Sequence, residues 1–76
     1  MLKLKHLKLK DILPLIDAID FIHIVYLGEL RHYNFDSPFD MENLHNKFGE
    51  KFITKISTVN YNYNDGYEVI YIEVED

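Results

Sequence analysis

The sequence contains no cysteine and no tryptophan, and only three glycines and two prolines among its 76 residues. Without cysteine the chain has neither a disulfide framework nor a thiolate zinc site. With so few glycines it has no glycine-rich loop to hold a phosphate. The length allows a single domain, residues 1–76, and excludes a two-domain enzyme, a barrel and a doubly wound nucleotide fold. Because so short a chain hides only about 60% of its extended surface on folding and has no covalent staple, we expect a homo-oligomer.

Basic residues are scarce after the first ten positions. The formal net charge is −5, and residues 1–10 contain four lysines and no acid, which leaves −9 on residues 11–76. An acidic body repels phosphate backbones, so we expect no direct binding of nucleic acid. The same charge either attracts a basic surface of another protein or only keeps a small domain soluble.

Long apolar runs are also absent. No run reaches the roughly 18 residues that a membrane-spanning helix needs, and lysines interrupt the leucines of residues 2–10, so these do not form the apolar region of a signal peptide. We therefore expect a cytoplasmic protein with no membrane partner. The Leu/Lys alternation of residues 2–10 changes phase at His6, which fits either an edge strand with a bulge or a basic arm over residues 1–8.

The first helix is predicted to begin at Lys10 or Asp11, because Pro14 is tolerated only in a first turn. Its apolar residues recur at intervals of three and four, as in an amphipathic helix. They are Ile12, Leu15, Ile16 and Ile19.

A second, short helix is predicted from Met41 to Lys47. Asp40 precedes it as the N-cap, and Gly49 follows its end. Four residues form its inward row: Met41, Leu44, His45 and Phe48.

Two strands are predicted between the helices. Residues 21–27 are β-branched, aromatic and almost wholly apolar, Gly28-Glu29 indicates a turn, and residues 30–35 form the returning strand of a hairpin. Because residues 21–27 are apolar on both sides, we expect an edge or a face of this strand to lie in a subunit contact.

A second hairpin is predicted at the end of the chain. Residues 51–64 and 67–75 flank Asp65-Gly66, a dipeptide that tight type I′ turns prefer. That turn pairs Tyr61 with Ile70 and Asn60 with Tyr71. Paired residues share a face of the sheet. The core face then holds Val59, Tyr61, Ile70, Ile72 and Val74, and the other face holds Thr58, Asn60, Asn62, Val69, Tyr71 and Glu73.

Together these elements predict an α+β domain with the order α-β-β-α-β-β. We expect a four-stranded antiparallel sheet with one amphipathic helix packed on it and a second short helix.

Three segments of the chain resemble a known group of proteins. Residues 9–17 (LKDILPLID), 55–57 (KIS) and 69–74 (VIYIEV) are similar to short α+β proteins of Firmicutes phages and prophages. The resemblance covers most of residues 8–75 and concerns the core pattern. It implies a phage accessory protein that acts in the host cell, and genes of this size often resemble inhibitors of host defence.

No constellation of residues indicates catalysis. The four histidines, His6, His23, His32 and His45, are not spaced as a metal motif. His23 and His32 are expected to lie side by side on facing strands as a two-histidine patch with a structural role. The carboxylates are scattered, and no serine stands in a nucleophile-elbow context. We therefore expect no enzyme, no metal and no cofactor.

The leading hypothesis is a non-enzymatic binding protein of a phage or mobile element. It would inhibit a host defence protein, such as a nuclease with a basic surface, by covering a functional surface. Tyrosine and asparagine suit an adaptable binding surface. The candidate partner-binding residues are Asn60, Asn62, Tyr67, Glu68, Tyr71 and Glu73.

Two alternatives belong to other classes. One is an oligomeric sponge that sequesters a nucleotide signalling molecule, with tyrosine rings stacked on the base and Arg31, Lys51 or Lys55 on the phosphate. The other is a structural or regulatory phage accessory protein.

Overall fold

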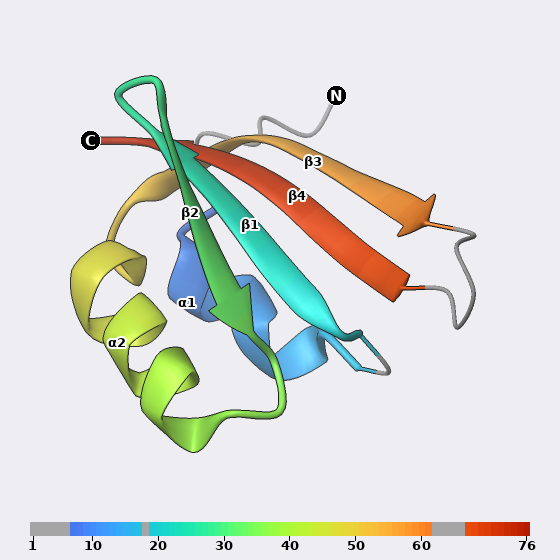
Figure 1. Ribbon diagram of the computed structural model, residues 1–76. Coiled ribbons are helices and arrows are strands. Elements are labelled where there is room, and N and C mark those ends of the chain that lie inside the picture. Colours follow the sequence, from blue (N-terminus) through green and yellow to red (C-terminus); the bar gives the residue numbers. More distant parts are fainter. Residues whose placement is uncertain (1–6, 18, 62–66) are drawn as a thin grey trace.

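The computed structural model describes residues 7–17, 19–61 and 67–76, without the side chains of residues 59–61 and 67. Its elements follow one another along the chain as Figure 1 shows. They are α1 (Leu9–Ile12), the 3-10 helix η2 (Leu13–Leu15), β1 (Phe21–Tyr26), β2 (Glu29–Asn34), α2 (Pro38–Phe48), β3 (Phe52–Tyr61) and β4 (Tyr67–Glu75).

The four strands form one mixed sheet in the order β2-β1-β4-β3. The two hairpins are antiparallel, but β1 and β4 lie side by side in the centre and run parallel. The predicted α+β class is confirmed, and the prediction of a fully antiparallel sheet is wrong. The reason is burial: β1 and β4 are the most apolar strands, and pairing them directly places both in the middle of the sheet.

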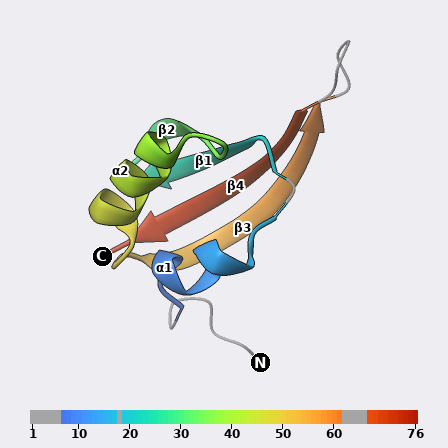
Figure 2. The same ribbon diagram turned by 90° about the horizontal axis from the view of Figure 1, so that it is seen from below.

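Both α-helices lie on the same side of the sheet (Figure 2). The core is between them and the strands, and the opposite side of the sheet has no described helix over it. Six side chains are fully buried in this core: Leu9, Ile22, Ile24, Leu44, Ile53 and Ile72.

The first helix is much shorter than predicted. It begins at Leu9 and ends after one turn, and η2 follows, so the observed order has one more element than predicted. With a start at Leu9, Pro14 would fall inside an α-helix, where it has no N–H to donate and clashes with the preceding turn. Leu15 is therefore 80% exposed instead of facing the core, although Ile16 and Ile19 still pack against the core.

The β1–β2 hairpin is confirmed, with its turn one residue earlier than predicted. Leu27 and Gly28 are the two turn residues, and both have positive φ, 51° and 79°. A two-residue turn with positive φ at both positions matches the twist of the two strands.

Helix α2 begins three residues before the predicted Met41. Ser37 is its N-cap, since the Ser37 hydroxyl accepts a hydrogen bond from the Asp40 N–H at 3.2 Å. The Asp40 carboxylate accepts instead from the Asn34 N–H at 2.9 Å, so it ties the helix to the end of β2.

The inward row of α2 is confirmed except for His45, which is exposed. Gly49 ends the helix in a right-handed conformation, with φ of −55°. A side chain does not fit there, because a Cβ atom would lie 2.4 Å from the carbonyl oxygen of His45.

The register of the second hairpin differs from the prediction by three residues. Asn60 pairs with Glu68, and Tyr61 pairs with Tyr67. The strand β4 has the predicted faces, with Ile72 and Val74 buried on the helix side. An odd shift moves the residues of β3 that follow the bulge to the other face, so the predicted face of Thr58 is wrong. The predicted turn at Asp65-Gly66 lies outside the described residues.

The segment before α1 runs along the outer edge of β3. Ile53 N–H donates to the Leu7 carbonyl at 2.8 Å, and Leu9 N–H donates to the Lys51 carbonyl at 3.0 Å. Residues 7 and 8 thus extend the sheet edge, and residues 1–6 are not described.

Lys8 and Lys10 bind the two oxygens of Glu50 at 2.8 and 2.6 Å. These two hydrogen bonds lower the pKa of Glu50 to about 2.

Candidate binding face

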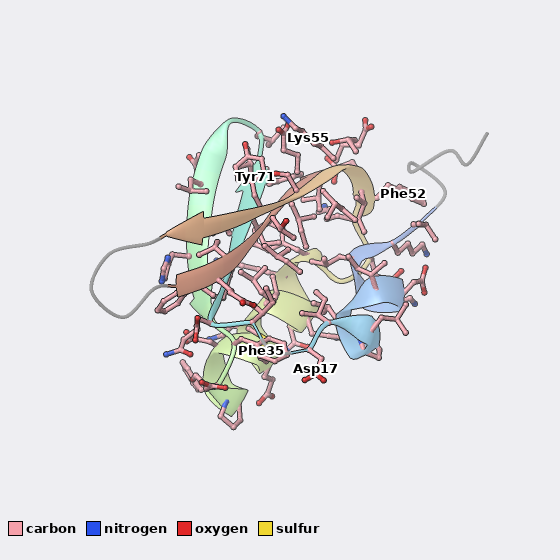
Figure 3. The ribbon with its side chains drawn as sticks, turned by 90° about the vertical axis from the view of Figure 1, so that its right-hand side faces the viewer. Asp17, Phe35, Phe52, Lys55 and Tyr71 are labelled. Atoms are coloured by element: carbon pink, nitrogen blue, oxygen red, sulfur yellow. The ribbon has the colours of Figure 1, made fainter. Side chains whose placement is uncertain are left out.

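The side of the sheet away from the helices is the candidate site. Side chains alternate across a strand, so the neighbours of the buried Ile22 and Ile24 point away from the core. Figure 3 shows Tyr71 and Lys55 on this side, with Phe35 and Asp17 on the helix side. We call this surface the helix-free face. It consists of Phe21, His23 and Val25 of β1; Leu30, His32 and Asn34 of β2; Lys55 and Ser57 of β3; and Val69, Tyr71 and Glu73 of β4.

The centre of the helix-free face is apolar and aromatic. Val69 is only 2% exposed although no described helix covers it. Phe21, Val25 and Tyr71 are half-buried, and Leu30 at the edge is 58% exposed. The apolar side chains of this face are therefore only partly buried, and part of their surface remains accessible to solvent.

Two histidines form a pair on this face. His23 lies opposite His32 in the β1–β2 ladder, and His23 Nε2 is 2.9 Å from His32 Nδ1. The predicted two-histidine patch is confirmed. One ring has to donate and the other to accept, so the hydrogen bond requires that at least one imidazole is neutral. Partial burial lowers the pKa of His23, and the charge that His32 would carry lowers it further.

Tyr71 continues the row next to the histidines. It is the register partner of His23 on β4, and the Lys55 ammonium lies 6.0 Å from the centre of its ring. Lys55 also approaches Glu73 at 3.9 Å. Burial raises the pKa of the Tyr71 phenol, and a hydrogen bond to Glu73 raises it further. Tyr71 thus keeps its O–H at neutral pH.

The structure gathers only part of the predicted contact set. Tyr71 and Glu73 lie on the helix-free face. Glu68 is exposed but occupies the opposite position in the alternation of β4, where its N–H donates to the Asp20 carboxylate at 2.9 Å. Asn60 and Tyr67 are described by their backbone pairing alone, and Asn62 is outside the described residues.

The predicted set of partner-binding residues did not include Phe21, Val25 and Val69, although the sequence placed Val69 on the same face as Tyr71. The signal was present, because Phe21 and Val25 alternate with the buried Ile22 and Ile24. The sequence predicts that an edge or a face of residues 21–27 lies in a subunit contact. The edge is excluded because β1 is paired on both sides by β2 and β4, and one of its two faces has no described helix over it.

The cations proposed for a nucleotide phosphate do not converge. Arg31 pairs with Glu29 at 3.0 Å, Lys51 pairs with Asp76, and Lys55 lies beside Glu73. Each faces a carboxylate at a different place in the fold. A phosphate needs several donors that converge on it, and these three cations do not provide such a cluster.

Further features of the described residues concern pockets, metal-binding groups and membrane-spanning helices. A depression of about 390 Å³ on the helix side is lined by Tyr33, Asn43, Asn46 and Lys47. No group of three or more His, Cys, Asp or Glu side chains is placed to hold a metal ion within residues 7–17, 19–61 and 67–76. In the same part of the chain, no helix has the length and apolar character that crossing a membrane requires.

Comparisons with protein-family models, with curated proteins and with solved structures found no match. The resemblance to phage proteins therefore stays a prediction. The helix-free face is the feature on which a function is proposed below.

Proposed function

We propose that the protein is a non-enzymatic binding protein that covers a functional surface of a partner protein with its helix-free face. The observation that carries this proposal is the apolar and aromatic centre of a sheet face that no described helix covers. Contiguous apolar patches of this kind on small domains mark interaction sites.

The residues on this face suit tight contact with another protein. Phe21 and Tyr71 are rigid aromatic side chains that bury large areas with little loss of entropy. Both are half-buried, so part of their conformational freedom is already lost before a partner arrives. Binding then costs less ordering than it would for free side chains.

Charge specifies the chemistry of the partner. Glu73 and the exposed Glu75 are acidic groups of β4 near this face, and residues 11–76 carry −9. A complementary partner has an apolar centre surrounded by basic residues. A basic channel that binds nucleic acid has this character, which supports a defence nuclease of the host as the partner. An acidic domain seated there excludes phosphate backbones.

A matched pair of variants tests this proposal in a bacterial host. Tyr71→Ala removes an aromatic ring from the centre of the helix-free face, and Asn46→Ala removes an exposed amide from α2 on the other side. We expect affinity capture with Asn46→Ala to recover the same partner as wild type. Tyr71→Ala should bind that partner at least about tenfold more weakly, as loss of a central aromatic does at other interfaces.

The second step uses the purified partner and measures its activity. Wild-type protein should inhibit it, and Tyr71→Ala, shown by circular dichroism to be folded, should inhibit it less. Equal binding by Tyr71→Ala and Asn46→Ala would contradict a role for this face. A nucleotide-sized adduct in native mass spectrometry, with no protein partner, would favour the sponge alternative.

A further inference from the structure

The histidine pair has a geometry that the proposed docking does not use. His23 and His32 stand directly opposite each other on adjacent antiparallel strands, so the backbone ladder sets the distance between them. His23 Nε2 and His32 Nδ1 are 2.9 Å apart, and the ring centres are 4.8 Å apart. Two imidazole nitrogens are therefore close enough to bind one metal ion without a movement of the backbone.

This distance matches one kind of metal coordination better than another. Two bonds of about 2.0 Å from imidazole to a metal, at a right angle, place the nitrogens about 2.8 Å apart, whereas tetrahedral bonds place them about 3.3 Å apart. Right angles belong to square-planar and octahedral ions, and imidazole suits Cu²⁺ and Ni²⁺. We propose that His23 and His32 form a two-histidine site that binds Cu²⁺ or Ni²⁺ in adjacent coordination positions.

Binding requires only local changes in the two rings. In the hydrogen bond, one nitrogen carries a proton and the other accepts it. A neutral donor ring moves this proton to its second nitrogen, so no net proton is released. Among the described residues, His23 Nδ1 and His32 Nε2 have no hydrogen-bond partner, and either can carry it. Each ring then has to turn by about 45° so that its lone pair, which in the hydrogen bond lies along the line between the two nitrogens, is directed at the ion.

The surroundings leave the site open. His32 is exposed and His23 is half-buried, both on the helix-free face. The Phe21 ring lies 4.6 Å from the His32 ring and supports it from one side. Because no third His, Cys, Asp or Glu of the described residues joins the pair, the ion keeps positions for water or for an incoming ligand. Such a site exchanges its metal, unlike a closed structural zinc site.

Titration calorimetry of the full chain with Ni²⁺ alone, in a buffer that does not bind metals, tests the proposal. We expect one Ni²⁺ per chain. His32→Gln and His23→Gln should each weaken this affinity at least tenfold. His45→Gln removes an exposed histidine of α2, and His6→Gln removes the histidine near the chain start; both should bind like wild type. Circular dichroism shows whether each variant is folded, and the exposed His32 allows a test even if His23→Gln is unstable.

Spectroscopy tests the geometry independently. Electron paramagnetic resonance of bound Cu²⁺ should show coupling to two imidazole nitrogens, and His32→Gln should leave one. The visible spectrum of bound Co²⁺ should have the weak bands of an octahedral ion, and strong tetrahedral bands would contradict the right-angle arrangement. No Ni²⁺ or Cu²⁺ binding by wild type would overturn the proposal, as would equal losses in His45→Gln or His6→Gln and in His32→Gln. These outcomes do not depend on whether a protein partner is found.

Discussion

The two faces of the sheet are made by the same strands and differ in how deeply their side chains are buried. On the helix side, Ile22, Ile24 and Ile72 are fully buried. On the helix-free face, Val25 and Tyr71 from the same strands are half-buried. Neighbouring residues of one strand therefore differ in burial because they point to opposite sides. An apolar strand thus contributes to the core on one face and leaves partly exposed apolar side chains on the other.

Chain length explains why only one face is covered. A sheet of four strands needs a second layer on each face that it is to bury. The described helices, α1, η2 and α2, are short, and both α-helices are on the same side (Figure 2). In the part of the chain that the structure describes, one face of the sheet carries the core and the other has no helix over it, so substitutions on the two faces should have different consequences.

The largest difference is expected between two neighbouring residues of β1. Ile24→Ala leaves a cavity in the core and should lower the free energy of unfolding by about 2–5 kcal/mol. This is a large part of the total for a small domain, which is about 5 kcal/mol at the low end of the usual range. Val25→Ala, on the helix-free face, should cost less than about 1.5 kcal/mol because its side chain is only partly buried. Urea unfolding of both variants measures the two values, and equal losses would contradict the comparison.

A smaller loss should follow from adding one methyl group on the helix side. Gly49→Ala places a Cβ atom 2.4 Å from the His45 carbonyl oxygen, so the end of α2 has to shift. We expect a loss of about 1–3 kcal/mol, as overpacking usually gives. Gly28→Asn is the control, because that position is open and asparagine tolerates a positive φ. Thermal unfolding compares the two variants. A Gly49→Ala variant as stable as Gly28→Asn would show that the helix end is less tightly packed than this geometry implies.

The smallest effect should come from the exposed ion pairs at the rim of the helix side. In the folded state the pKa of Glu50 is about 2, below its ordinary 4.5, because Lys8 and Lys10 donate hydrogen bonds to it. The unfolded chain binds the proton more readily, so this stabilisation is complete above pH 4.5 and is lost as the pH falls towards 2.

Glu50→Gln should therefore lower the melting temperature slightly at pH 7 and have almost no effect at pH 2. Because both lysines and Glu50 are exposed, salt should reduce the difference at pH 7. The measurement is the melting temperature of wild type and variant at both pH values. A difference that grows at low pH would show that the ion pairs are not its cause.

Local patterns predicted several elements correctly. The bounds of β4 are those expected from its apolar alternation, and the β1–β2 hairpin follows from strong strand formers on either side of Gly28. That hairpin also placed His23 beside His32, because a short turn leaves few possible registers. Each of these features depends on residues that are close in sequence.

Features that depend on distant segments were predicted less well. The parallel pairing of β1 with β4 joins residues almost fifty positions apart, and no local pattern encodes it. The register of β3 was inferred from Asp65-Gly66 as a two-residue turn, whereas the observed ladder begins at Tyr61 and Tyr67. A bulge between Ile53 and Lys55 also changes which residues of β3 face the core. The candidate binding face consequently moved from β3 and β4 to β1 and β4.

The amino-acid sequence alone determined which segments are strands, that residues 21–34 form a hairpin and that two histidines meet, since these follow from neighbouring residues and backbone geometry. The tertiary structure decided which apolar face the helices cover. That choice depends on contacts between segments far apart in the sequence, because β4 lies beside β1 and the helices bury both central strands on one side. The apolar residues on the other side have no described helix over them.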